Sequence, residues 1–433
     1  MKKLSYSFLA IFMVLFVAVS CSKSDSDNDA DSLLRTVPAD ASSVALCNVA
    51  YIVDRLGGTS DGSTIKLSKE HTKAIQESQA LKEKDKKNIM DVLEGKTGMA
   101  LNSFVYFAAA RTYITGLLND PDKFIAYVQE QNPSLQWRDE NGGKVLGQMA
   151  VVGNQFWICT TGTPDVEQLK YYQQLNDKQS YMSSDAISLL SDTEKGVTFV
   201  ADVKKTIAFL PNSTYLRLGA SLIFNDMSYV AGSVDIEKNN IMASAAVLNS
   251  NMKPAELLLP TEKIDGSIVK SLEGSGNFVG AIGVSQKLVK KISDVAGSAM
   301  GQGSDALAGV LQAVDGTIAG MASSSLDDVE VKIQTNGKDF ADMSNLIQSM
   351  SGLTVTRDGN MLTATKGNKN FSGPITSDEA SEKLKGAWIG IVSYGMIARD
   401  VVTVARLVPE KKSLRLDVEA EGGVDAFLNA VLK

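Results

Sequence analysis

The stretch Val197-Thr198-Phe199-Val200-Ala201-Asp202-Val203 combines an apolar strand with a polar corner, and we expect a helix to follow it. A run of apolar residues that ends at a short polar side chain is typical of a strand that turns into a helix. The same order of strand, polar or glycine hinge and helix occurs at three further places, namely Val44–Val49, Phe278–Val284 and Trp388–Tyr394. The predicted order of strands and helices follows from this repeated unit.

Hairpins follow these units, and each reads as two strands around a polar turn. The alternation of apolar and polar residues in Leu414–Glu419 predicts that one face of each sheet contacts water. The order of elements therefore predicts an α+β protein of tandem β-α-β-β-α units, with mixed or antiparallel sheets and helices packed on one face. The predicted hairpins span residues 228–248, 316–335, 352–366 and 401–420.

The order of elements also suggests an internal duplication. Residues 38–260 form a first α+β half and residues 275–433 a second, and each half runs through a longer block and then a shorter one. A duplication would make the strands beginning at Val44 and Phe278 equivalent, and likewise those beginning at Val197 and Trp388.

Helix starts are predicted from capping residues. Asp120-Pro121 and Thr163-Pro164 each place a capping oxygen before a proline at the first helical position, and Ser285 precedes an apolar stripe at helical spacing. Further helices are expected over residues 68–93, 338–350 and 424–432.

The first twenty residues are typical of a secretory signal peptide. Lys2 and Lys3 form the basic start, and Phe8–Val19 is an apolar run of about twelve residues. A membrane-spanning helix needs about twenty, so this run is too short to span a bilayer. We therefore expect residues 1–20 to be removed.

Ala18-Val19-Ser20-Cys21 resembles a bacterial lipobox, in which a cysteine is linked to diacylglycerol, becomes the new N-terminus and is acylated, with palmitate for example. The alternative is an ordinary cleavage site with a chance cysteine. The lipobox reading makes Cys21 a lipidation site, and several acyl chains would hold the protein on a membrane.

Residues 21–37 are predicted to be a lipidated, disordered tether, because the residues that follow Cys21 are polar and acidic. The acidic stretch resembles the export signal that sends lipoproteins of the Bacteroidetes to the outer face of the outer membrane. It implies a surface-exposed outer-membrane lipoprotein, with the periplasmic leaflet as the alternative. Asp31-Ser32-Leu33 also resembles the O-glycan acceptor site of Bacteroides-type secreted proteins, so Ser32 is a candidate glycosylation site, although such a triplet also arises by chance.

The segment Leu33–Ala41, with its Val37-Pro38-Ala39-Asp40-Ala41-Ser42 core, resembles the start of uncharacterised outer-membrane lipoproteins of Bacteroides-type gut bacteria. The resemblance covers the signal, the tether and the strand–helix order. It implies a localisation and carries no catalytic motif.

Composition excludes several classes of function. The 433 residues carry a formal net charge of −7, which disfavours nucleic acid as a partner. One histidine and three cysteines offer little material for a metal or redox site, so we predict no metal and no cofactor. Cys47 and Cys159 lie in apolar strand-like runs, where they form either a disulfide bridge or two buried thiols.

Catalytic motifs are present only as fragments. Ser63-Thr64-Ile65-Lys66 and Lys96-Thr97-Gly98 match pieces of the penicillin-recognising serine enzymes, but their order and spacing are wrong. His71 has no cysteine or serine partner that the sequence suggests. We therefore predict a non-enzymatic binding or assembly module of the cell envelope, held to the membrane by its lipid and contacting other envelope proteins or glycans. The alternative is a glycan- or peptide-directed hydrolase with unidentified acidic residues.

Overall fold

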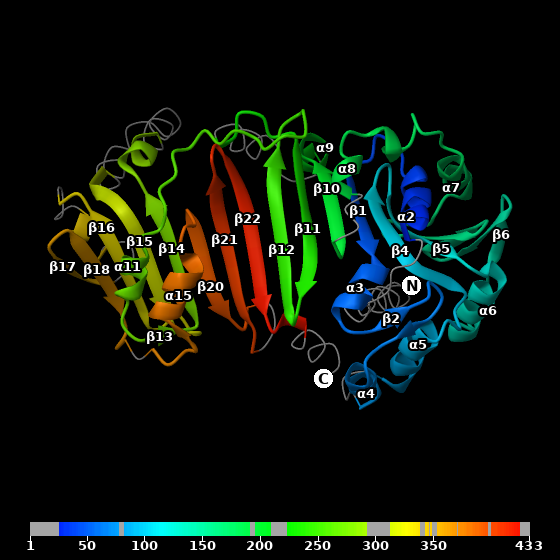
Figure 1. The fold of residues 1–433 in the computed structure, drawn as a ribbon, viewed down its shortest axis with the longest axis horizontal. Helices are drawn as coiled ribbons and strands as arrows, with labels where there is room; N and C mark the ends of the chain where they lie inside the picture. Colours follow the sequence, from blue (N-terminus) through cyan, green and yellow to red (C-terminus); the bar gives the residue numbers. More distant parts are fainter. Residues whose placement is uncertain are drawn as a thin grey trace.

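The computed structural model describes residues 26–77, 82–190, 195–208, 223–291, 312–337, 343–345, 347–348, 353–369, 371–396 and 400–424. Within these residues, eighteen strands form one large sheet against which helices pack (Figure 1). The protein is therefore mixed helix and strand, as the sequence predicts. All strand pairings of the described residues are antiparallel. Two short pairs lie outside this sheet, β2 (Thr59–Ser60) with β3 (Ile65–Lys66) and β13 (Ser275–Gly276) with β19 (Ile375–Thr376).

The sheet is continuous along the molecule. Its strand order is β6-β7-β8-β9-β5-β4-β1-β10-β11-β12, joined through β12 and β22 to β22-β21-β20-β14-β15-β16-β18-β17. The strands of the first part are β1 (Ser43–Asn48), β4 (Met99–Ala108), β5 (Thr112–Leu118), β6 (Arg138–Glu140), β7 (Gly143–Leu146), β8 (Met149–Val152), β9 (Gln155–Cys159), β10 (Val197–Asp202), β11 (Tyr229–Glu237) and β12 (Asn240–Leu248). Those of the second part are β14 (Phe278–Val284), β15 (Val314–Ala322), β16 (Val329–Thr335), β17 (Thr354–Asp358), β18 (Met361–Lys366), β20 (Ile389–Tyr394), β21 (Val402–Glu410) and β22 (Ser413–Glu421).

The two faces of the sheet can be followed through the register, because directly paired residues share a face and successive residues alternate. Face A carries Ala45 and Leu416, and face B carries Leu46 and Asp417. In the middle of the sheet, β11, β12, β22 and β21 lie side by side (Figure 1). Their residues are mostly half-buried.

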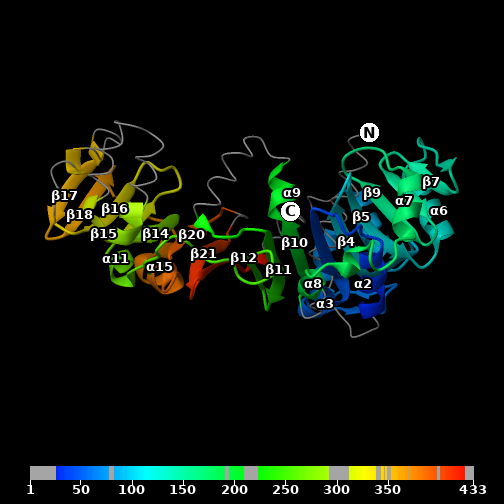
Figure 2. The same ribbon diagram turned by 90° about the horizontal axis from the view of Figure 1, so that it is seen from above.

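Helices cover face B near both ends of the sheet. In the first part, α2 (Ser26–Arg35), α7 (Val166–Gln173) and α8 (Ile187–Leu190) share a core with Leu46 and Phe107. In the second part, α11 (Gly266–Lys270) and α15 (Ser377–Leu384) share a core with Val279 and Val392. Figure 2 shows α11 and α15 on the same side of the sheet as α2.

Face A of the first part is also covered, so the prediction that helices pack on one face is wrong there. The helices on this face share a core with Cys47 and Phe104. The physical reason is that β1 is apolar on both faces, which requires cover on both sides. These helices are α3 (Val49–Arg55), α4 (Lys69–Glu77), α5 (Glu83–Leu93) and α6 (Pro121–Gln131).

The predicted disordered tether is wrong for residues 26–37. Residues 26–35 form helix α2, and Leu33, Leu34 and Val37 are fully buried against face B. The acidic composition of residues 22–31 obscured the apolar anchor at the end of the segment, which provides the burial that ordering requires. Residues 21–25 lie outside the described part of the chain.

The capping predictions have different outcomes. Asp120 caps α6, because its side chain accepts a hydrogen bond from the Lys123 N–H at 2.9 Å. The predicted cap at Thr163 is wrong, since Asp165 caps α7 by accepting from the Glu167 and Gln168 N–H groups. Ser285 accepts from the Leu288 N–H at 3.2 Å. The predicted helix over 68–93 is described as two helices, α4 and α5. Most of residues 338–350 and residues 425–432 lie outside the described part of the chain.

The two internal cysteines are free, buried thiols. Cys47 belongs to the core on face A and Cys159 to the core on face B, so the sheet separates them. Burial raises the pKa of Cys47 to about 12, which keeps it an uncharged thiol. Of the alternatives for this pair, the structure supports the two buried thiols. The helices of the described residues include none with the length and apolar character to cross a membrane.

Candidate functional site

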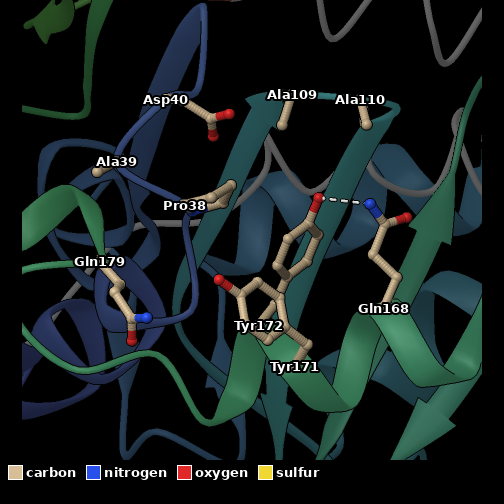
Figure 3. A pocket seen from close by; sticks show the side chains of 9 residues that line it. All are labelled: Pro38, Ala39, Asp40, Ala109, Ala110, Gln168, Tyr171, Tyr172 and Gln179. Carbon is tan, nitrogen blue, oxygen red and sulfur yellow. Dashed lines mark hydrogen bonds between the residues drawn. The ribbon is translucent and has the colours of Figure 1, made fainter.

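An open pocket of about 400 Å³ lies where the chain leaves α2 and enters the first strand (Figure 3). The segment 38–40 forms one wall, the β4–β5 turn forms another, and helix α7 supplies the aromatic side chains. The lining residues are Pro38, Ala39, Asp40, Ala109, Ala110, Gln168, Tyr171, Tyr172 and Gln179.

Backbone hydrogen bonds hold the first wall in place. The Ala39 N–H donates to the Gln179 carbonyl oxygen at 2.9 Å, and the Tyr181 N–H donates to the Val37 carbonyl oxygen at 2.7 Å. Pro38 and Ser180 form a β-bridge between these two contacts. The wall is therefore fixed to the segment after α7 and is not a free loop.

Helix α7 orients the two tyrosines differently. Leu169 and Tyr172, three residues apart, both point into the core. Tyr171 lies next to this stripe, and its side chain is 54% exposed. The ring centroids of Tyr171 and Tyr172 are 6.1 Å apart. The pocket thus has one buried ring beside one ring that faces solvent.

A short hydrogen-bonded chain fixes the polar groups of the pocket. Gln168 Nε2 donates to the Tyr172 hydroxyl at 2.9 Å (Figure 3). Gln168 Oε1 accepts from the Tyr113 hydroxyl at 3.2 Å. Burial, with a smaller contribution from the charge of Asp40, raises the pKa of Tyr172 to about 12. The hydroxyl therefore stays neutral at physiological pH and can both donate and accept.

The lining residues combine aromatic, amide and carboxylate groups. Among the nine lining residues, Asp40 is the one carboxylate, whereas glycoside hydrolysis ordinarily uses a pair of carboxylates on either side of the bond. An exposed aromatic ring beside amide and carboxylate groups matches a ligand with both apolar and hydroxyl-bearing surfaces, such as a sugar ring.

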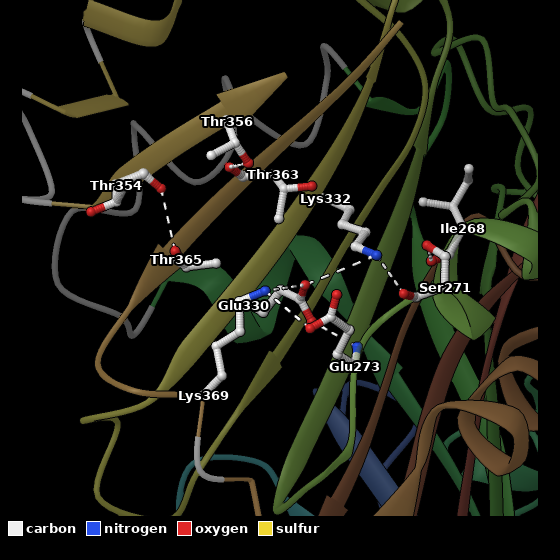
Figure 4. A network of polar contacts seen from close by, with 10 residues as sticks. All are labelled: Ile268, Ser271, Glu273, Glu330, Lys332, Thr354, Thr356, Thr363, Thr365 and Lys369. Atoms are coloured by element: carbon white, nitrogen blue, oxygen red, sulfur yellow. Dashed lines mark hydrogen bonds and ion pairs between the residues drawn. The ribbon is translucent and has the colours of Figure 1, made fainter. Parts of the chain in front are cut away.

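A second cluster of charged groups lies on face B of the second part (Figure 4). Glu330 in β16 is fully buried, and its Oε2 accepts from the Glu273 N–H at 2.8 Å. Its Oε1 lies 3.5 Å from Lys369 Nζ and 3.9 Å from Lys332 Nζ. Lys369 also donates to Glu273 at 3.2 Å, and this hydrogen bond raises the pKa of Lys369.

This cluster ties loops to the sheet. Lys332 Nζ donates to the Ser271 carbonyl oxygen, so β16 is joined to the segment after α11. A carboxylate as deeply buried as Glu330 offers no surface to a polymeric substrate. Glu330 and Glu273 are therefore better explained as structural groups than as the acid pair of a hydrolase.

The site residues predicted from sequence lie elsewhere. Cys21 is outside the described residues. Ser32 is exposed but lies within helix α2, so the expected extended segment at this position is wrong. Neither Tyr171 nor Tyr172 is among the site residues predicted from the sequence. The signal that could have found them is their adjacency in a helix whose buried stripe includes Leu169, because only one of two neighbouring tyrosines can share that stripe.

Comparisons with known proteins add little. No family model matches the chain, and no curated protein matches it. Among solved structures, crystal forms III, I and IV of TP0453 are similar over 81%, 81% and 83% of this chain and 96%, 94% and 98% of that chain. Each is 8% identical in sequence, and the TM-scores are 0.24, 0.26 and 0.26. Similarity this low carries no argument about fold or function.

Proposed function

We propose that this protein is a lipid-anchored, non-enzymatic binding module of the outer membrane and that its ligand is a glycan held in the pocket beside Tyr171. The observation that carries the proposal is the exposed Tyr171 ring, which lines the same pocket as the Asp40 carboxylate and the Gln168 amide, itself hydrogen-bonded to Tyr172. A tyrosine offers both an apolar ring and a polar hydroxyl group, so an exposed tyrosine that lines a pocket can contact the apolar and the hydroxyl-bearing surfaces of one ligand.

The anchor is proposed from the N-terminal sequence. The signal peptide and the lipobox lead to Cys21, and the acidic stretch covers residues 22–31. Helix α2 already begins at Ser26, within that stretch. The ordered part of the protein would then lie close to the bilayer, with few residues between lipid and fold. We assign the protein to the uncharacterised Bacteroides-type lipoproteins and place it on the cell surface, with the periplasmic leaflet as the alternative.

We also propose an O-linked glycan on Ser32. The motif Asp31-Ser32-Leu33 supports it, and the residue is exposed on α2. Because Ser32 is helical, modification before folding is the simplest route to it. Intact-mass measurement of native protein against Ser32→Ala tests this, and masses that differ by the hydroxyl oxygen alone would dismiss it.

The chain is further proposed to consist of two copies of one unit, spanning residues 38–260 and 275–433. The register supports this. Ser43 at the start of β1 pairs with Ala201 on one side and Ala108 on the other. At the start of β14, Phe278 pairs in the same way with Ser393 in β20 and Ala322 in β15.

Both parts of the sheet also contain a register shift between two neighbouring strands. The β4–β5 register shifts between Met99 and Phe104, and the β15–β16 register shifts between Val314 and Ile318. Such bulges are local features of a strand pair, and their recurrence at one place in the strand order favours common origin. The second part offers no counterpart of Tyr171 in α15, so the proposed ligand site belongs to one half.

The experiment is a screen of the purified protein on immobilised oligosaccharides. The expected result is binding to a subset of glycans that Tyr171→Ala loses and Tyr106→Ala retains, since Tyr106 is an exposed tyrosine at a different pocket. Mass spectrometry of the bound glycans distinguishes a binding protein from the alternative, a hydrolase. Shortened glycan chains would establish a hydrolase. Binding that Tyr171→Ala leaves unchanged would contradict the proposed site.

A further inference from the structure

Face A is apolar across the middle of the sheet. The residues of β22 that point to face B are charged or polar, such as Arg415, Asp417 and Glu419, whereas those on face A include Leu416 and Val418. Three large apolar side chains on face A remain exposed, namely Tyr106 at 38%, Leu416 at 39% and Ile391 at 37%. The three side chains share this face but lie on separate strands, β4, β22 and β20.

The register joins Tyr106 and Leu416 into one row. From Tyr106 in β4 the row runs through Ala45, Phe199, Gly232 and Ala245 to Leu416 in β22. No member carries a charged side chain. Face A therefore has no charged group along this row to oppose a hydrocarbon ligand.

At the Tyr106 end, face A contains a pocket of about 280 Å³. Ala45 and Cys47 form its floor, and its walls include Tyr106, Phe104, Ile114 and Val197. None of its lining residues is charged. Cys47 adds no charge either, because burial keeps its thiol protonated.

The small floor residues explain why a pocket forms here. Cys47 pairs with Phe104 on one side and Val197 on the other. In the second part, Ile282 pairs in the same manner with Ile318 and Ile389. The branched side chain of Ile282 in β14 therefore fills the position that corresponds to Cys47 in β1, where the smaller thiol leaves space.

We infer that this pocket binds the hydrocarbon chain of a fatty acid. A volume of about 280 Å³ holds roughly nine groups the size of a water molecule, at about 30 Å³ each, and a methylene group is of similar size. The pocket therefore accepts a linear chain of about nine carbons, and the carboxylate projects past Tyr106 toward solvent. This inference does not depend on the lipid at Cys21 or on the glycan pocket.

The limited volume of the pocket predicts how affinity depends on the length of the fatty acid. Each buried methylene contributes about a fourfold gain in affinity, so binding should strengthen with every added carbon until the pocket is full. Beyond about nine or ten carbons the gain should cease, because further methylenes lie outside the pocket. A non-specific apolar surface would instead keep gaining affinity with length.

The test is calorimetric titration of the full chain carrying Cys21→Ala, which removes any attached lipid, with sodium hexanoate, octanoate, decanoate and dodecanoate below their micelle concentrations. Cys47→Ile places in the floor of the pocket the side chain that Ile282 has at the corresponding position of β14. This variant should bind decanoate at least tenfold more weakly. Ala243→Val is the matched control, since it adds carbons to face A outside the pocket. It should leave affinity unchanged.

Phosphatidylethanolamine–phosphatidylglycerol vesicles form a second arm that separates free fatty acid from membrane lipid. Saturable decanoate binding that Cys47→Ile weakens and Ala243→Val does not weaken supports the inference. Absence of decanoate binding, affinity equal in wild type and Cys47→Ile, or flotation with vesicles without decanoate binding would each overturn it. Circular dichroism of both variants verifies that they fold.

Discussion

Ser244 in β12 pairs directly with Asp417 in β22, and each is the fifth residue of the strand that follows its hairpin turn. The two hairpins close alike, at Glu237 with Asn240 and at Glu410 with Ser413. A residue that pairs with its own counterpart marks a local two-fold axis. The proposed duplicated halves therefore meet edge to edge, as two copies of one unit would in a symmetric dimer.

The hairpin turns provide a first test of this equivalence. Lys238 and Lys411 both have left-handed backbones, with φ of 56° and 55°. Such a conformation costs a non-glycine residue about 1 kcal/mol. Lys238→Gly and Lys411→Gly should therefore each change stability by less than about 1 kcal/mol, in the stabilising direction, and to a similar extent. Urea unfolding measures both.

Lys412→Gly is the matched control in the same turn. Lys412 lacks a positive φ, and its Nζ donates to Glu256 at 3.0 Å, so glycine there should destabilise the protein. Opposite signs for Lys238→Gly and Lys411→Gly would contradict the equivalence of the two turns.

Glu330 should be a stability determinant. Glu330→Ala leaves the Glu273 N–H without its acceptor and removes a buried partner of Lys369, at a cost of about 3 kcal/mol in the free energy of unfolding. Glu330→Gln keeps an acceptor and should cost less. Glu273→Ala removes an exposed carboxylate and should cost under about 1 kcal/mol. Equal losses for Glu330→Ala and Glu273→Ala would refute the structural role.

Asp226 should make stability depend on pH in the acid range. Hydrogen bonds from Ser228 and from the Ser250 backbone and side chain lower the pKa of Asp226 to about 2, from 3.8. A carboxyl whose folded pKa is depressed contributes stability above its unfolded pKa, and this contribution is lost as pH falls from about 4 to about 2. Asp226→Asn should lack that part of the loss. Urea midpoints between pH 5 and pH 2 measure it, and parallel curves for both proteins would contradict the assignment.

Cys21→Ala should release the protein from membranes without changing its fold, because the proposed acyl chains are its attachment. Fractionation of cells that express each form measures the distribution. Wild-type protein and variant found equally in the outer-membrane fraction would exclude the lipid anchor.

Local features of the fold could be predicted from the sequence. The hairpin around residues 237–240 and the cap at Asp120 depend on neighbouring residues, and both are present. Asn48, the polar residue at the end of the predicted strand Val44–Val49, likewise caps α3 by accepting from the Tyr51 N–H at 3.0 Å. Such features rest on interactions within a few residues, which a sequence pattern records.

The rest depends on contacts between distant segments. The β12–β22 junction joins residues far apart in the chain, and no local pattern specifies that edge. The burial of Leu33 and Leu34 requires a surface built by β1 and β4, so the composition around them predicted a tether instead. The pocket at Tyr171 is lined by Pro38 and Gln179, which are distant from each other in the sequence, so no local pattern predicts Tyr171 as a binding residue.

The most direct test of the proposed binding function is the affinity of Tyr171→Ala and Tyr171→Phe for a glycan that the wild-type protein binds, measured by calorimetric titration. If the ring stacks on the sugar, Tyr171→Phe should bind within about threefold of wild type, while Tyr171→Ala should lose at least about tenfold, the loss expected for one aromatic contact of about 1.4 kcal/mol. Equal affinity of Tyr171→Ala and wild type would contradict the account.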